Sequence, residues 1–150
     1  MKNFFISYTK TDKPWAEWVN WFLQDKGFST FVQFKDIGWG QNFVVRMDDG
    51  LKQADRLITI LSPEFLTSGF TKSEWAAVFA KDPDGSKGLL LPIRIKECDL
   101  SGLLFPRAYL DLAGLDEAQA SKRLADGLAG LHLSPTGPDR IDPRAPFPIA

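Results

Sequence analysis

The 150-residue sequence contains only one cysteine, Cys98, and one histidine, His132. A single cysteine cannot form an intrachain disulfide, and nothing around Cys98 indicates a reactive thiolate. Two such residues are too few for a zinc site, so we expect no metal. A Ser/His or Cys/His hydrolase is nearly excluded, because His132 borders a proline-rich tail and no GxSxG motif is present.

An excess of one charge and long apolar runs are also missing. Lys and Arg number 18 against 19 Asp and Glu, which leaves a net charge of -1 and no basic field for nucleic acid or an anionic membrane. No apolar stretch approaches the roughly 20 residues of a membrane span, and no signal peptide precedes the first apolar run. We therefore expect a cytoplasmic protein with neither nucleic-acid nor membrane partners.

Common nucleotide and phosphoryl motifs are absent or incomplete. The phosphate loop GxxxxGK[ST] does not occur, and "GWGQNF" begins like GxGxxG but has Phe43 in place of the third glycine. A phosphoacceptor receiver domain needs an aspartate at the end of its third strand, where this chain has "LSP". These classes of protein are therefore disfavoured.

Short apolar segments alternate with segments whose apolar residues recur at helical spacing. We expect helices from Pro14 to Gly27, with Asp12 as a candidate cap, then over 43–54, around Glu74 and over about 116–131. Strands are expected at residues 2–8, 28–34, 56–62, 88–95 and about 107–112. Alternation of this kind predicts one α/β domain, with a parallel sheet covered by helices on both faces. Ligands of such sheets bind outside the carboxyl ends of the strands, here in the loops after Tyr8, Phe34 and Leu61.

Residues 134–150 differ in composition from the rest of the chain. They hold five of its ten prolines and show neither helical nor alternating patterning. We predict a domain over 1–133, followed by a proline-rich linker or tail that leads to downstream domains.

The segment "FLTSGFTKSEWAAVFA" places the carboxylate of Glu74 at the start of a helix, with aromatic residues on both sides. Thr71 and Glu74 fit a capping box, in which the glutamate only satisfies a free backbone N–H. Alternatively, a carboxylate in a partly apolar cleft can stabilise the positive sugar carbon of an oxocarbenium-like transition state. A glycosidic bond to cationic nicotinamide suits a site with one such group, because nicotinamide leaves as a neutral molecule. Both interpretations stay open on the sequence.

Three stretches between residues 2 and 131 resemble the Toll/interleukin receptor (TIR) domain, in particular its bacterial members. They are "FFISYTKTD", "FSTFVQFKDIGWGQNF" and "ADRLITILSPEFLTSGFTKSEW". The last is the most specific, because the strand, "LSP" and the glutamate occur in order. The resemblance implies a flavodoxin-like sheet of five parallel strands. For many members it also implies cleavage of NAD+ to nicotinamide and ADP-ribose or a cyclic ADP-ribose.

The resemblance also implies roles for individual residues. Glu74 matches the catalytic glutamate of the family, and Phe70 stands where many members have a tryptophan that packs on the ligand. Tyr8, Thr9 and Lys10 match the loop that lines the cleft after the first strand.

Two positions depart from the family pattern. Gly38, Trp39 and Gly40 replace an Arg-Pro-Gly run in the loop after the second strand, where Trp39 offers a surface for stacking or for a neighbouring domain. Gln33 replaces an acidic residue that some NAD-cleaving members carry. Gln33, Trp39 and Gly40 are therefore further substrate-binding candidates.

The expected function is an NAD+ nucleosidase that acts in bacterial immunity or stress signalling. NAD+ is the substrate, with no cofactor and no metal, and activity requires association between TIR domains. The alternative is a non-catalytic interaction module that passes a signal by homotypic TIR–TIR association.

Overall fold

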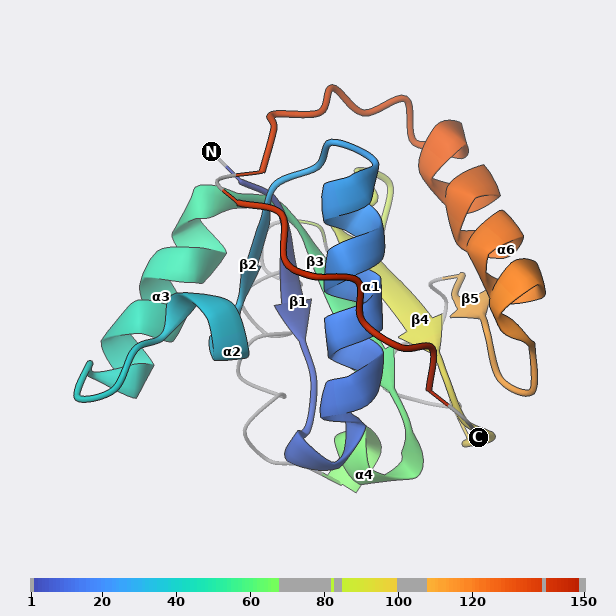
Figure 1. The fold of residues 1–150 in the computed structure, drawn as a ribbon, viewed down its shortest axis with the longest axis horizontal. Coiled ribbons are helices and arrows are strands. Elements are labelled where there is room, and N and C mark those ends of the chain that lie inside the picture. Colours follow the sequence, from blue (N-terminus) through green and yellow to red (C-terminus); the bar gives the residue numbers. More distant parts are fainter. Residues whose placement is uncertain (1, 68–81, 83–84, 100–107, 139, 149–150) are drawn as a thin grey trace.

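The computed structural model describes residues 2–67, 82, 85–99, 108–138 and 140–148. Its centre is a five-stranded sheet with the order β2-β1-β3-β4-β5 (Figure 1). Every pair of neighbouring strands is parallel. The strands are β1 (Lys2–Ser7), β2 (Thr30–Val32), β3 (Ala54–Leu61), β4 (Leu90–Arg94) and β5 (Leu110–Asp111). This is the strand order of flavodoxin-like folds, so the predicted fold class is confirmed.

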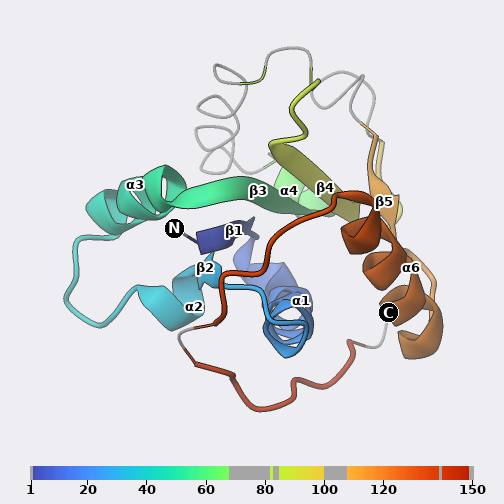
Figure 2. The ribbon, with the colours of Figure 1, turned by 90° about the horizontal axis from the view of Figure 1, so that it is seen from above.

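Helices cover both faces of the sheet. On one face, α1 (Lys13–Asp25) and α6 (Glu117–Gly130) pack over the side chains of Phe4, Ile58 and Ile93, and Figure 2 shows both helices on that side. The second core lies between the opposite face and the helices α3 (Phe43–Gln53) and α4 (Pro63–Thr67). No helix in the described part of the chain is both long and apolar enough to span a membrane.

Local sequence signals account for most helix boundaries. Asn42 caps α3 by accepting a hydrogen bond from the Val45 amide, and Gly27 follows α1 with a φ of 90°. Asp116 and Gln119 form a reciprocal capping box at the start of α6. Asp12 occupies the N-cap position of α1, as predicted, but its side chain accepts no hydrogen bond from the backbone of that helix. The predicted capping bond of Asp12 is therefore wrong.

The second strand is shorter than predicted. It ends at Val32, and residues Gln33–Asp36 form the helical turn α2. The Asp36 carboxylate accepts a hydrogen bond from the Val32 amide at 2.8 Å, and the Lys35 ammonium donates to the Thr30 carbonyl at 2.8 Å. These two bonds satisfy backbone groups on the outer edge of β2 and hold the turn α2 against that edge, where the chain leaves the sheet.

Residues 134–148, hereafter the C-terminal strap, contain no helix or strand among the described positions. The strap runs along α1 from the carboxyl end of that helix to its amino end (Figure 1). No pattern in the sequence predicts this packing. The interpretation of residues 134–150 as a linker stays a prediction.

Candidate functional site

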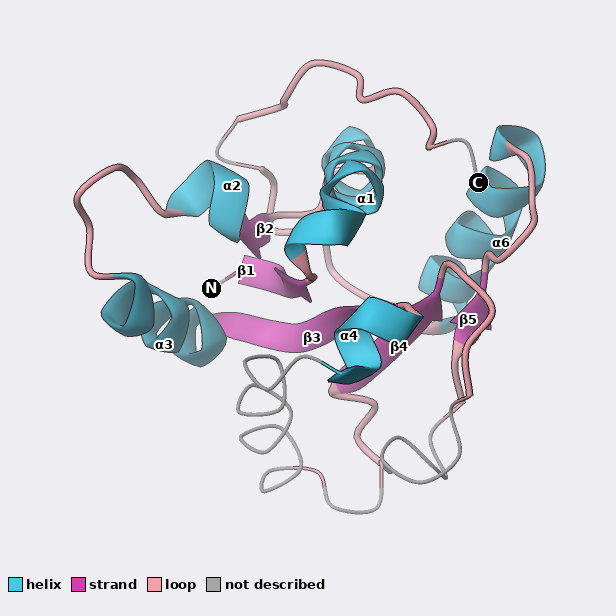
Figure 3. Cartoon of the chain, turned by 90° about the horizontal axis from the view of Figure 1, so that it is seen from below, coloured by secondary structure: helices cyan, strands magenta, loops and turns pink. Residues whose placement is uncertain are grey.

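A pocket of about 480 Å³ lies at the carboxyl ends of β1 and β2. Figure 3 is drawn from the side of the sheet on which these strands end. The pocket is lined by Tyr8, Lys10, Lys13, Gln33, Phe34 and Ile37. The structure therefore brings together three of the sequence candidates, Tyr8, Lys10 and Gln33, at the edge where parallel sheets bind ligands.

Aromatic rings form one wall of the pocket. Tyr8 follows the last residue of β1, and its ring meets Phe34 of α2 edge to face, with 6.0 Å between centroids. The Lys13 ammonium lies 5.9 Å from the centroid of the Phe34 ring. Because α2 turns away from the sheet, it carries both Gln33 and Phe34 to this wall.

Burial raises the pKa of Tyr8 to about 12. A backbone hydrogen bond at Phe34 opposes the rise, and the negative charge of Glu17 adds to it. A tyrosine phenol is neutral at physiological pH, and burial keeps Tyr8 neutral to a higher pH still, so its hydroxyl remains a hydrogen-bond donor.

Two lysines give the pocket a positive character. Lys10 begins the 3-10 helix η1 (Lys10–Asp12), and Lys13 is the first residue of α1. Both are exposed, and none of the lining residues in the described part of the chain is acidic. The arrangement suits an anionic ligand with flat rings. Lys13 was missed on the sequence, although its place three residues after Lys10 in "KTDK" puts both on one helical turn.

Asp12 is a fully buried carboxylate that lies in the chain between the lining residues Lys10 and Lys13. One carboxylate oxygen accepts hydrogen bonds from the hydroxyls of Thr9, at 2.9 Å, and Ser62, and the other pairs with the Lys96 ammonium at 3.1 Å. These partners come from the segments after β1, β3 and β4. Asp12 thus ties together three loops at the carboxyl edge, a role that only the folded chain makes visible.

The remaining described candidates do not line the pocket. Thr9 is directed to Asp12, as its hydrogen bond shows. Trp39 is fully exposed, at 107% of its reference area, and Gly40 has a φ of 84° in the turn that Gln41 closes by donating its amide to the Gly38 carbonyl. Their predicted substrate contacts stay predictions.

Glu74 and Phe70 lie outside the described residues, so their predicted roles also stay predictions. Among the described residues, no group of three or more His, Cys, Asp and Glu side chains is placed to hold a metal ion.

Fold and pocket together define a flavodoxin-like α/β domain with a basic, aromatic pocket at its carboxyl edge. A family model described as the TIR domain matches residues 4–125. The chain belongs to the TIR domain family. Comparison with curated proteins gave no match.

Solved structures support the same fold. The TIR domain of the Toll-related receptor TRR-2 from Hydra magnipapillata is similar, with a TM-score of 0.72 and 19% identity over 89% of this chain and 100% of that one. A prokaryotic SEFIR domain is similar with a TM-score of 0.60 and 15% identity over 90% of this chain and 95% of that one. At these identities the likeness concerns the fold alone.

Proposed function

We propose that this TIR domain is an NAD+ nucleosidase that releases nicotinamide together with ADP-ribose or a cyclic ADP-ribose. The observation that carries the proposal is the pocket at the carboxyl edge, where Lys10 and Lys13 lie beside the rings of Tyr8 and Phe34. The family includes enzymes that cleave NAD+ and domains that only associate, so the pocket chemistry is what favours an enzyme.

The pocket complements NAD+ in charge and in shape. The diphosphate of NAD+ is anionic, and lysine ammonium groups bind phosphate oxygens through charge-assisted hydrogen bonds. Adenine and nicotinamide are flat rings that pack on aromatic faces such as Phe34. The neutral Tyr8 phenol supplies a hydrogen-bond donor that carries no charge to repel the substrate's phosphates.

The proposed reaction breaks the bond between the ribose C1′ and the nicotinamide nitrogen. The bonding electron pair leaves with nicotinamide, which becomes neutral and needs no proton. Glu74 is the proposed carboxylate that stabilises the cationic ribose. Water then adds to C1′ and releases a proton to solvent, or an adenine nitrogen adds and gives the cyclic product. NAD+ is the substrate, and the proposal uses no metal and no further cofactor.

Nicotinamide release from NAD+ tests the proposal. We expect release by the concentrated wild-type chain and a loss of at least about 100-fold in Glu74→Gln, because the substitution removes the charge that meets the developing cation. The double variant Lys10→Ala/Lys13→Ala is expected to raise the KM for NAD+ at least about tenfold. Lys122→Ala is the matched control, since Lys122 is an exposed lysine on α6 whose partner among the described residues is Asp126, one turn away.

A second function has its own supporting observation. Trp39 is fully exposed and lies outside the pocket lining, as a residue that meets a neighbouring domain would. Domains of this family associate with one another, and a homotypic interaction module would need no turnover. If the chain releases no nicotinamide from NAD+ even when it is forced to cluster, the interaction module is favoured. Trp39→Ala is then expected to weaken self-association.

The proposal also covers the location of the protein and its role in the cell. We place it in the cytoplasm, as an effector of bacterial immunity or stress signalling that carries downstream domains. Sequencing the region that follows residue 150 in its gene is the direct check.

A further inference from the structure

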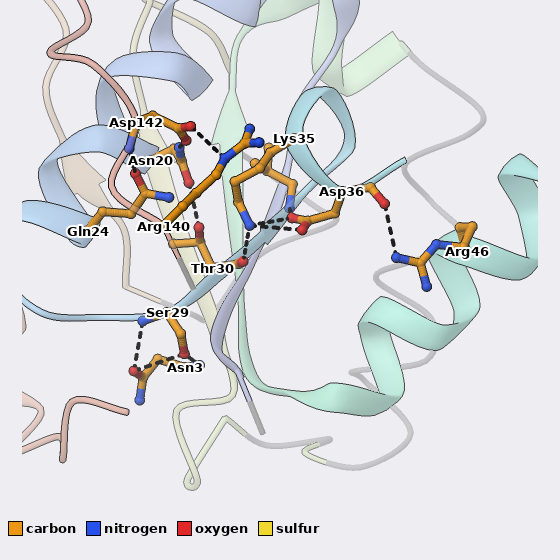
Figure 4. A network of polar contacts seen from close by, with 11 residues as sticks. Asn3, Asn20, Gln24, Ser29, Thr30, Lys35, Asp36, Arg46, Arg140 and Asp142 are labelled. Atoms are coloured by element: carbon orange, nitrogen blue, oxygen red, sulfur yellow. Dashed lines mark hydrogen bonds and ion pairs between the residues drawn. The ribbon is translucent and has the colours of Figure 1, made fainter. Parts of the chain in front are cut away.

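Two fully buried side-chain amides on α1 are bonded to the C-terminal strap. Asn20 and Gln24 are 1% and 2% exposed, and they lie one helical turn apart. The Asn20 Nδ2 donates to Asp142 Oδ2 at 2.9 Å, and the Asp142 amide donates to Gln24 Oε1 at 2.9 Å. Each amide group thus depends on the strap for a partner, as Figure 4 shows for Gln24 and Asp142.

The contacts continue from Asn20 towards the pocket. Asn20 Oδ1 accepts a hydrogen bond from the Thr30 hydroxyl in β2, and the Thr30 carbonyl accepts from the Lys35 ammonium. Lys35 pairs with Asp36, whose carboxylate holds the Val32 amide. Figure 4 shows this series of contacts running from Asp142 to α2.

The end of this series bears directly on the pocket wall. Residues 33–36 form α2, and Gln33, Phe34 and Ile37 line the pocket. The Lys35 side chain is only 5% exposed, so its bonds to Thr30 and Asp36 are largely shielded from water. Thr30 is therefore linked to α2 through contacts for which water competes little.

The strap is anchored on both sides of the place where Asp142 contacts α1. On one side, the Thr136 amide donates to Asn3 Oδ1 at 3.0 Å, and the Gly137 amide donates to the Gly27 carbonyl at 3.0 Å. On the other, the Phe147 ring packs edge to face on Trp15 and Trp18, with centroids 5.1 and 5.0 Å away. Asp142 is therefore held against α1 from both directions.

We propose that the C-terminal strap regulates the pocket, with Asn20 and Lys35 as positioning residues. Docking of Asp142 orients the Asn20 amide, because its Nδ2 faces the carboxylate and its Oδ1 is left for the Thr30 hydroxyl. Thr30 and Lys35 then fix α2 in the arrangement that lines the pocket. Release of the strap leaves Asn20 without this constraint and loosens α2.

Amide hydrogen exchange of the full chain tests the coupling without any ligand. In Asp142→Ala we expect exchange at the amides of Val32 and Ile37 to quicken by about tenfold, because these two amides close α2. The Leu57 amide, bonded to the Leu89 carbonyl in the sheet, is the reference for global opening. An unchanged rate at α2, or an equal increase at Leu57, would overturn the proposal.

A control and a double variant separate the proposed series of contacts from general loosening. Arg144 also belongs to the strap, but it contacts Glu117 and the ring of Trp21 instead of the amides of α1. We expect Arg144→Ala to leave the exchange of α2 unchanged. In an Asn20→Leu background, Asp142→Ala should have no further effect on α2. Additive effects in that background would contradict the role of Asn20.

The consequence for the ligand rests on the proposed function. We expect the Kd for NAD+ to rise about tenfold in Asp142→Ala and to stay at the wild-type value in Arg144→Ala. If the wild-type chain binds no NAD+, the proposed function fails, while the exchange measurement still decides whether strap and pocket are coupled. If NAD+ binds equally to wild type and Asp142→Ala, the regulation fails and the proposed function stands.

Discussion

Asp12 is a buried side chain that connects three loops at the carboxyl edge. Its carboxylate has no exposed area and is satisfied by Thr9, Ser62 and Lys96. A buried charge is tolerated only when its partners are in place, so the three loops that supply them are fixed relative to one another.

We predict that Asp12→Ala lowers the free energy of unfolding by about 3 kcal/mol, because it leaves the buried Ser62 hydroxyl without its acceptor and Lys96 without its counter-charge. Urea unfolding measures the change. Asp126→Ala is the control, since Asp126 forms an exposed pair with Lys122 and has no other ion pair with a described residue, and we expect a change of less than about 0.5 kcal/mol. Equal effects of the two substitutions would show that burial of Asp12 does not matter.

Tyr8 provides a prediction about pH. Burial raises its pKa to about 12, above the ordinary value of 10.0, so the folded state favours the neutral phenol. The stability that this burial contributes is complete below the ordinary value and is lost as the pH rises through the folded value.

We therefore expect one tyrosine of the folded chain to ionise near pH 12 when phenolate absorbance is followed, and Tyr8→Phe to remove that step. We also expect wild type to lose stability between about pH 10 and 12, and the variant to lose less there. A titration in which Tyr8→Phe removes a step at the ordinary tyrosine pKa would contradict the burial described for the pocket.

At the scale of elements, α3 approaches β2 so closely that one position admits no side chain. A Cβ added at Gly50 would lie 2.5 Å from two atoms of the Phe31 ring. Phe31 cannot easily move, because it is 2% exposed and stacks on Phe5 with 5.3 Å between centroids.

We predict that Gly50→Ala destabilises the fold by about 2 kcal/mol, although alanine favours a helix interior by about 1 kcal/mol. Gly127→Ala in α6 is the matched control, since its Cβ would make only an ordinary 3.5 Å contact with Leu110. We expect that substitution to stabilise the fold. Thermal unfolding of the two variants gives the comparison, and a stabilised Gly50→Ala would refute the close packing of α3.

The sequence predicted elements well wherever one periodic pattern covered the whole element. The stripe that includes Trp15, Trp18 and Val19 forms the buried face of α1, and the run at residues 56–62 lies within β3 except for its last residue. Such patterns are local consequences of burying one side of a helix or both faces of a strand.

Elements that depend on distant or competing side chains were not predictable in this way. Gln33 and Phe34 continue the alternating pattern of the strand, yet residues Gln33–Asp36 form α2, which the Asp36 carboxylate holds to the Val32 amide. Asp12 has the spacing of a helix cap, but its partners Ser62 and Lys96 lie 50 and 84 residues away. Local propensity carries no information about such partners.

At the scale of the whole molecule, the C-terminal strap completes the covering of α1. Phe147 packs on two tryptophans of that helix, and Glu117 of α6 accepts hydrogen bonds from both Trp18 and Arg144. The composition of this segment indicates only a proline-rich stretch without a periodic pattern, because most of its contacts are with residues more than 100 positions earlier.

We predict that Phe147→Ala lowers the free energy of unfolding by about 2 kcal/mol, since it removes the ring that covers Trp15 and Trp18. Tryptophan fluorescence during denaturant unfolding measures the loss and should also report greater exposure in the native state. Ile141→Ala is the control, because Ile141 lies in the same strap but is 65% exposed. If the two variants lose the same stability, the strap does not depend on the aromatic contact.

The sequence predicted where the pocket lies, but it predicted only some of the residues that line it. The loops after β1 and β2 do meet at the carboxyl edge, as parallel topology requires. Lys13 was missed because the matched segment "FFISYTKTD" ends one residue before it, and Trp39 is exposed and lies outside the lining. The arrangement of a pocket depends on where neighbouring elements end, which no single motif encodes.

The most direct test of the account is nicotinamide release from NAD+ by the full chain under conditions that promote clustering. We predict release by wild type, loss of release in Glu74→Gln with the fold retained, and wild-type rates in Lys122→Ala. Release that persists in Glu74→Gln, or no release by any clustered form of the wild-type chain, would contradict it.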